Sequence, residues 1–183
     1  MSFRTKAAFG APPISRKGLD ITGLSARAQT LHRHGHIAEA RAVYQKILKK
    51  RPNHFEAMYM FAVCERQSGN FVSAVRLLRR ALLIDPRSPE VRSELGLALG
   101  AAQQLDEALA CFDKLISLKP DFAEAHYNRG NVLLAIGRFD EANASFGKTT
   151  SIDPDHVSAW NNRGNACCSL ANLNSAWRAT AMP

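Results

Sequence analysis

One pattern recurs at a constant interval along the chain, and it is clearest in residues 89–122, PEVRSELGLALGAAQQLDEALACFDKLISLKPDF. It closes at Pro120, and Pro52, Pro86 and Pro154 close similar apolar runs at a constant spacing of 34 residues. Proline disrupts a helix, so each of them marks a break between helical segments. Repetition at a period of about 20 to 50 residues is typical of solenoids and arrays. Counting back from the prolines predicts five repeats: 21–54, 55–88, 89–122, 123–156 and 157–183, the last one incomplete.

Small residues recur at fixed positions within this frame. The eighth position is alanine or glycine, and the twentieth is alanine in all five repeats: Ala40, Ala74, Ala108, Ala142 and Ala176. Such positions let two helices of about 14 residues, each about 21 Å long, approach closely. The fifteenth position is glycine in three repeats, which suits the left-handed conformation that ends a helix. Each repeat is therefore predicted to be a helix-turn-helix hairpin.

This pattern resembles the tetratricopeptide repeat (TPR), whose consensus has W-x2-L-G-x2-Y, then A-x3-F, then P. The similarity covers Ile21 to about Met182, and repeats 2 to 4 match it best. The resemblance implies an all-α fold, a right-handed α-solenoid (superhelix) of TPR hairpins that lean on their neighbours. We expect residues 21–183 to form this domain and residues 1–20 to be a disordered basic leader.

In this family the first helix of each repeat lines a concave groove. Asn128 and Asn131 are one helical turn apart there, as are Asn162 and Asn165. An amide both donates and accepts hydrogen bonds, so this ladder of asparagines can pair with the backbone of an extended peptide. The opposing interpretation is that asparagine is simply common at these positions of the family. The predicted peptide-binding residues are Asn128, Asn131, Asn162, Asn165, Asn161, Tyr127, Tyr59 and Met60, with the tyrosines and the methionine supplying aromatic and apolar contact.

The repeats are also similar to those of O-linked N-acetylglucosamine transferases and related bacterial TPR proteins, in which groove asparagines hold the substrate backbone. Two functions therefore remain open. The first is a non-catalytic scaffold that binds a partner protein or an extended peptide in its groove. The second is the substrate-recognition arm of a larger glycosyltransferase-type enzyme, separated from its catalytic domain.

The net charge of +8 is unevenly distributed. Residues 1–92 carry 17 Lys and Arg against 6 Asp and Glu, whereas residues 93–183 carry 7 against 10. Basic side chains can attract an acidic protein or a nucleic acid. The arginines fall mainly on convex second helices without an interleaved aromatic platform, which argues against nucleic acid. A solvated surface is the favoured interpretation, and an acidic partner comes second. The basic residues concerned include Lys49, Lys50, Arg51, Arg76, Arg79 and Arg80.

Motifs for catalysis are missing from the sequence. It contains no P-loop, GxGxxG, HExxH or GxSxG motif and no CxxC pair, so we expect no enzyme activity, no cofactor and no metal site. No run approaches about 18 apolar residues, so we expect no membrane span. The free cysteines and the absence of a secretory signal predict a cytoplasmic location.

The last repeat departs from the pattern. It keeps Trp160 and Gly164 but has Thr180 where the consensus has an aromatic residue, and no polar capping helix follows it. An uncapped solenoid exposes an apolar edge. We therefore hypothesise that the C-terminal edge, near Leu170, Leu173 and Trp177, mediates self-association.

Overall fold

The computed structural model describes the backbone of residues 20–180 and the side chains of residues 20–172. Nearly all of the predicted leader thus lies outside the described residues. Within residues 20–180 the chain forms nine helices and no strand. The helices are α1 (Ile21–Arg33), α2 (Ile37–Lys50), α3 (Phe55–Gln67), α4 (Phe71–Ile84), α5 (Pro89–Ala101), α6 (Leu105–Leu118), α7 (Ala123–Ala135), α8 (Phe139–Ile152) and α9 (Val157–Thr180).

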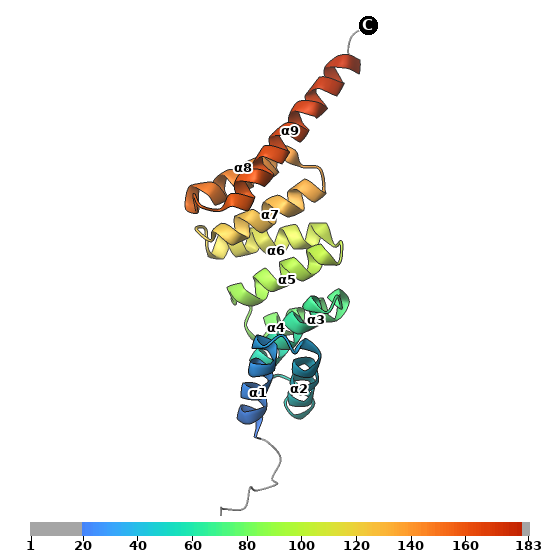
Figure 1. Ribbon diagram of the computed structural model, residues 1–183, viewed down its shortest axis with the longest axis vertical. Coiled ribbons are helices and arrows are strands. Elements are labelled where there is room, and N and C mark those ends of the chain that lie inside the picture. Colours follow the sequence, from blue (N-terminus) through green and yellow to red (C-terminus); the bar gives the residue numbers. More distant parts are fainter. Residues whose placement is uncertain (1–19, 181–183) are drawn as a thin grey trace, which may run out of the picture.

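The first eight helices pair as hairpins that stack along the long axis of the molecule, from α1 and α2 at one end towards α9 at the other (Figure 1). This confirms the predicted all-α solenoid of helical hairpins. The odd-numbered helices begin at the first residue of each predicted repeat, and we keep the repeat division given above as our proposal. Contacts skip one helix between α3 and α5, α5 and α7, and α7 and α9. The first helices therefore lie close together and line the inner face of the stack.

The fifteenth position makes the turn inside each of the four hairpins. Gly35, Gly69 and Gly137 have φ angles of 79°, 79° and 78°, and Gln103 adopts φ 59° at the equivalent position. This left-handed conformation is energetically unfavourable for residues other than glycine, so Gln103 is the strained member of the set. The predicted left-handed turn is thus present in the third hairpin although its glycine is missing.

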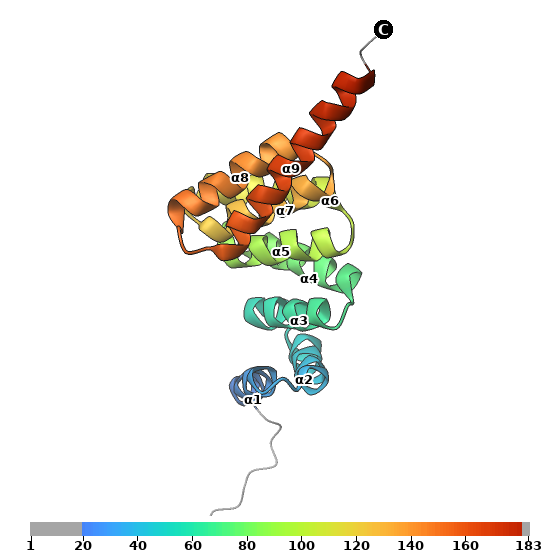
Figure 2. The same ribbon diagram turned by 45° about the horizontal axis from the view of Figure 1, so that its top comes forward.

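The fifth unit differs from the prediction. The fifteenth position of this repeat is Ala171, where the hairpin pattern predicts a turn before an incomplete second helix, but α9 is one helix of 24 residues. Figure 2 shows its C-terminal half projecting away from the stack. Alanine is the best helix former and disfavours the left-handed turn, so the backbone at Ala171 continues the helix.

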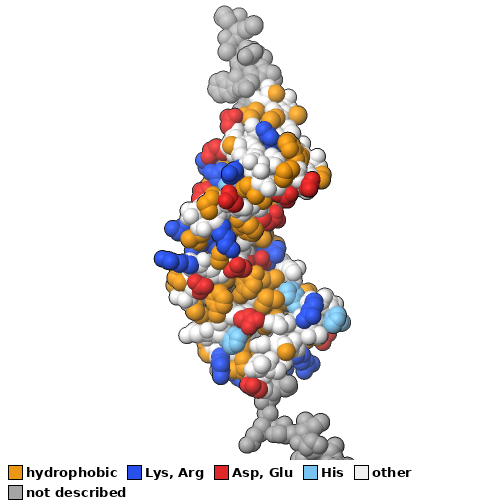
Figure 3. Space-filling view, turned by 90° about the vertical axis from the view of Figure 1, so that its left-hand side faces the viewer, with side chains coloured by type: hydrophobic (Ala, Val, Ile, Leu, Met, Phe, Trp, Pro, Cys, Tyr) orange, Lys and Arg blue, Asp and Glu red, His pale blue; other side chains and the backbone are white. Residues whose placement is uncertain are grey.

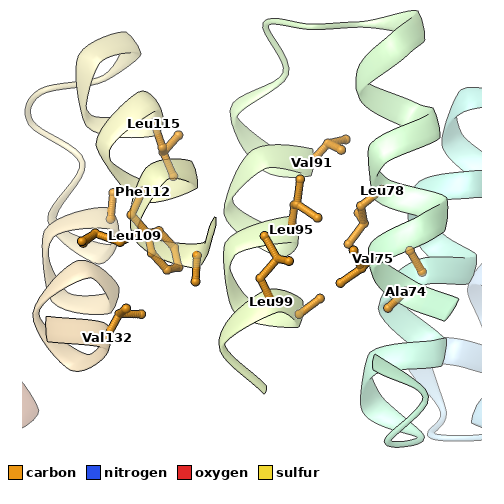
Figure 4. Close-up of a cluster of buried hydrophobic side chains, with 14 of the residues drawn as sticks. Ala74, Val75, Leu78, Val91, Leu95, Leu99, Leu109, Phe112, Leu115 and Val132 are labelled. Carbon is orange, nitrogen blue, oxygen red and sulfur yellow. The ribbon is translucent and has the colours of Figure 1, made fainter. Parts of the chain in front are cut away.

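The core repeats with the hairpins because small residues of one helix face aromatic residues of its partner. Phe112 and Phe146 are fully buried at the twenty-fourth position of repeats 3 and 4. A Cβ atom added to Gly96 would lie 2.6 Å from Cζ of Phe112, and one added to Gly130 would lie 2.6 Å from Cε1 of Phe146. Figure 4 shows the Phe112 ring projecting from α6 towards α5. Glycine is thus required wherever the ring lies directly against the backbone of the first helix.

Candidate peptide-binding groove

The eight predicted peptide-binding residues lie on three first helices of the inner face. Six of them are half-buried, whereas Asn161 and Asn165 are exposed. By helix, α3 carries Tyr59 and Met60, α7 carries Tyr127, Asn128 and Asn131, and α9 carries Asn161, Asn162 and Asn165. Helix α5 lies between the two parts, so the structure separates Tyr59 and Met60 from the asparagine-rich part.

The two asparagine pairs are joined across helices. Nδ2 of Asn162 donates a hydrogen bond of 2.8 Å to Oδ1 of Asn131 and lies 3.5 Å from the hydroxyl of Tyr127. This arrangement leaves the amide group of Asn131 as a donor and the carbonyl of Asn162 as an acceptor. The structure thus brings Tyr127, Asn131 and Asn162 together, and the pair offers one donor and one acceptor, which is what a peptide backbone requires.

Tyr127 is held by aromatic neighbours from α8 and from the turn that precedes α9. Its ring centroid lies 4.5 Å from that of His156 and 5.9 Å from that of Phe146, both in tilted arrangements. Nδ1 of His156 accepts the backbone N–H of Ala159 at the start of α9, so the proton of a neutral imidazole is on Nε2. That Nε2 lies 3.3 Å from the Glu124 carboxylate, to which it can donate. The tyrosine ring is therefore packed on several sides, and its hydroxyl lies beside the asparagine pair.

Tyr59 lies in a different environment at the other part of the groove. Burial, together with the carboxylates of Glu94 and Glu90, raises the pKa of its phenol above the ordinary value. Its ring packs against the main core, whereas Met60 packs against the cluster of the first hairpin. These two side chains thus form an apolar surface near acidic groups.

Polar bridges join neighbouring first helices along the groove. Gln29 donates to Glu56 at 2.6 Å, and His32 and Gln67 are 3.0 Å apart, so α1 is tied to α3. Arg66 forms an ion pair with Glu94, which ties α3 to α5. The single sequence could have suggested the last pair only by its opposite charges. Residues 27 or more apart can meet in this way because the repeats stack.

The step from α5 to α7 is different. Between these two helices, both of which are fully described, no side-chain hydrogen bond or ion pair is present. A pocket of about 260 Å³ opens there instead, and Asn128 and Asn131 lie at it. Leu97, Gly100 and Ala101 of α5 face them. The sequence patterns described above did not predict this pocket, although Gly100, which has no side chain, indicates an opening on this face of α5.

Some of the basic side chains on α4 are already paired within the protein. Arg79 pairs with Glu107 at 2.5 Å, and Arg80 donates to the carbonyl of Pro52 at 3.0 Å. On the face shown in Figure 3, Lys and Arg side chains are spread along the molecule among acidic and hydrophobic side chains. Val72 and Leu83 of α4 are each 82% exposed. Binding of an acidic partner at this face stays a prediction, as does the expectation that nucleic acid does not bind there.

The described part of the chain gives little support to a metal site or a membrane span. No group of three or more His, Cys, Asp or Glu side chains there could hold a metal ion, and no helix there is long and apolar enough to cross a membrane. Burial raises the pKa of the Cys64 thiol to about 11, as expected for a cysteine used as a core residue. Leu170 is half-buried, and the side chains of Leu173 and Trp177 lie outside the described residues, so self-association stays a prediction.

Comparison with solved structures places this geometry among TPR proteins. The MamA protein superposes with a TM-score of 0.77 at 25% identity, over 86% of each chain. YrrB, described as a TPR protein with an unusual peptide-binding site, superposes with a TM-score of 0.71 at 24% identity, over 84% of this chain and 79% of YrrB. These similarities agree with the solenoid described above.

Comparison with curated sequences gives partial matches. The chain is 33% identical over 100 residues to the CTR9 homolog of Arabidopsis thaliana, which is 54% of this chain and 9% of that protein. It is 28% identical over 107 residues to the protein O-mannosyl-transferase TMTC1 of Mus musculus, 56% of this chain and 11% of that protein. The matched region thus spans about a tenth of either relative. The similarity to O-linked N-acetylglucosamine transferases stays a prediction.

Family models match most of the repeat region. Two models described as tetratricopeptide repeat match residues 31–98 and 123–156, and one described as TPR repeat matches residues 101–137. Together they cover more than half of the 183 residues. Their positions coincide with the hairpins from α2 to α8 and extend into α1. The chain therefore belongs to the tetratricopeptide-repeat proteins.

Proposed function

We propose that this protein is a non-catalytic interaction scaffold that binds an extended segment of a partner protein on its inner face. The observation that carries the proposal is the Asn131–Asn162 pair, held at 2.8 Å across α7 and α9 beside Tyr127. Its remaining donor and acceptor match those of a peptide bond and do not depend on the peptide's side chains. Peptide binding by YrrB, a protein of the same fold, is consistent with this use of the surface.

The neighbourhood of the pair supports the same function. Tyr127 is a rigid aromatic side chain with a polar tip, a type enriched at protein interfaces. Asn165 lies one helical turn beyond Asn162 and is exposed, so the polar surface continues along α9. A bound backbone could therefore find several hydrogen-bonding groups in a row.

The test uses peptides of 12 residues selected from a random displayed library on the purified protein. Binding of the selected peptides is measured by fluorescence anisotropy to this protein and to Asn131→Ala and Asn162→Ala. We expect each variant to weaken binding about tenfold, because loss of one or two backbone hydrogen bonds costs about 1 to 2 kcal/mol. The matched control is Asn53→Ala, at an exposed asparagine in the turn between α2 and α3, and it should change nothing. Failure to select any peptide, or equal binding by all variants, would show that the groove is not a peptide site.

A second function, the recognition arm of a glycosyltransferase-type enzyme, is favoured by one observation. The match to TMTC1 shows that similar repeats occur in a protein named as an O-mannosyl-transferase. This function predicts a catalytic domain encoded in the same reading frame. Sequencing the full transcript would separate the two functions, because the scaffold needs no such domain.

A further inference from the structure

The inner face has one gap in its cross-links, between α5 and α7. Position twelve of the repeats, which faces the next first helix, is His32, Arg66, Gly100, Leu134 or Cys168 in turn. His32 and Arg66 bridge to the following helix, whereas Gly100 has no side chain with which to do so. A Cβ atom added to Gly100 would find nothing within 4 Å. The gap therefore lies where α5 has no polar side chain to offer, with Gly100 at position twelve and the apolar Leu97 at position nine.

The recess left by this gap has an apolar floor and an amide rim. Its apolar lining includes Leu97, Phe112 and Val132, of which Figure 4 shows Phe112 on α6 and Val132 on α7. Asn128 and Asn131 stand at the recess from α7. The Asn128 side chain makes no hydrogen bond with any described residue, and Oδ1 of Asn131 is taken by Asn162. One amide at the rim is thus entirely available to a ligand.

The size of the recess suits one side chain better than a small-molecule ligand. Its volume is about 260 Å³, whereas pockets for small molecules typically measure about 300 to 1,000 Å³. At about 30 Å³ per water molecule it has room for fewer than about ten waters. A single Leu, Met or Phe side chain can fill such a space and leave its backbone near the rim amides.

The residues that line the recess are uncharged, and acidic side chains lie beyond it, at the N-terminal ends of α5 and α7. Glu90 and Glu124, at the second positions of α5 and α7, have side chains that are 63% and 54% exposed. Glu90 accepts a hydrogen bond from the Ser88 hydroxyl at 3.1 Å and has the Lys119 ammonium at 3.9 Å, and Glu124 lies 3.3 Å from Nε2 of His156. The arginines on the same helices point elsewhere, since Arg92 donates to the carbonyl of Pro86 and Arg129 pairs with Asp113. A ligand carrying a positive charge is therefore complementary to this part of the groove.

We infer that the recess between α5 and α7 is the side-chain pocket for an extended peptide that carries a Leu, Met or Phe with a Lys or Arg near it in sequence. The apolar side chain occupies the recess, and Asn128 bonds the adjoining backbone. Glu90 and Glu124 attract the basic residue. The inference rests on the proposed function and adds to it the class of peptide that the groove selects.

The sharpest test fills the recess. Gly100→Leu places a side chain in open space and replaces glycine in a helix by a good helix former, so the variant should fold at least as well as the parent. Peptides selected as above should be enriched in the apolar-plus-basic pattern and should bind Gly100→Leu at least tenfold more weakly. The matched control is Ala144→Leu, which adds the same residue at an exposed position of α8 and should leave binding unchanged. Glu90→Gln combined with Glu124→Gln should weaken binding several-fold at low salt and less at high salt.

Each other outcome overturns the inference, and the outcomes separate it from the proposed function. Peptides that lose affinity with Asn131→Ala but not with Gly100→Leu would leave the groove as a peptide site and remove the recess from it. Enrichment of acidic peptides would contradict the charge argument. A dimer that light scattering detects in the parent and not in Gly100→Leu would assign the recess to a second copy of the chain. Selection of no peptide would remove both proposals.

Discussion

At the scale of single residues, the buried hydroxyl of Tyr44 is the least satisfied group of the first hairpin. Tyr44 is 1% exposed, and its hydroxyl has no hydrogen-bond partner among the described residues. Repeats 3 and 4 have Phe112 and Phe146 at the same position, where no hydroxyl has to be buried. A buried polar group without a partner costs about 1 to 3 kcal/mol, so this tyrosine lowers the stability of its hairpin.

We predict that Tyr44→Phe raises the free energy of unfolding by about 1 to 2 kcal/mol at neutral pH. Burial, with smaller effects of Cys64 and Glu56, raises the pKa of Tyr44 from 10.0 to about 12 in the folded protein. A folded-state pKa above the unfolded one stabilises the protein below pH 10, and this contribution is lost as the pH rises towards 12. The advantage of the phenylalanine should therefore grow above pH 10. Urea denaturation of the parent and of Tyr44→Phe at pH 7 and pH 11 measures both effects. Equal midpoints of the two proteins at each pH would contradict the prediction.

At the scale of helices, the contact between the two helices of a hairpin depends on the eighth position. In the fourth hairpin Gly130 of α7 lies against the Phe146 ring of α8, and a Cβ atom there would meet three ring carbons at 2.6 to 2.8 Å. Phe146 is fully buried and cannot move into solvent. A methyl group at this position would therefore push α7 away from α8.

Two alanine substitutions separate this packing from helix propensity. Gly130→Ala should lower the free energy of unfolding by about 1 to 3 kcal/mol, the usual cost of overpacking a filled core. Gly147→Ala makes the same change on α8, where the added Cβ would lie 3.7 Å from Arg163 in ordinary contact. That control should raise the free energy by up to about 1 kcal/mol through helix propensity. Thermal and urea denaturation measure both, and changes of the same sign would show that packing against Phe146 is not the deciding term.

At the scale of the whole molecule, stability is distributed along the stack. The buried side chains form two clusters, one within α1, α2 and α3 and a larger one from α3 to α9. Each hairpin packs mainly against its neighbours, which is the nearest-neighbour arrangement of repeat proteins. Among the described residues the first hairpin has a neighbour on one side only, so we expect it to open more readily than the central ones.

Two core truncations test this distribution. Ile47 and Leu115 are both fully buried, in the smaller and the larger cluster respectively, and truncation of either to alanine should cost about 2 to 5 kcal/mol locally. We expect Ile47→Ala to reduce hydrogen-exchange protection mainly in α1 and α2. Leu115→Ala should reduce protection from α4 to α8, because a central unit supports both of its neighbours. Uniform loss of protection in both variants would indicate one cooperative unit instead.

Local sequence patterns were enough to predict the four hairpins from α1 to α8 and the small residues at their contacts. The rules involved act over short distances: proline ends a helix, glycine or a strained residue such as Gln103 makes the turn, and small residues admit the ring of Phe112 or Phe146. The same rules predicted that Asn128 and Asn131 share one face of a helix. They failed at Ala171, where helix propensity prevailed over the expected turn.

Which groove residues meet depends on how the hairpins stack. The bond between Asn131 and Asn162, the ion pair between Arg66 and Glu94, and the open recess at Gly100 each involve side chains of different repeats. These residues are about thirty positions apart, and the angle between successive hairpins sets their distance. That angle results from the packing of all side chains at the interface together, so no local pattern in one sequence reports it.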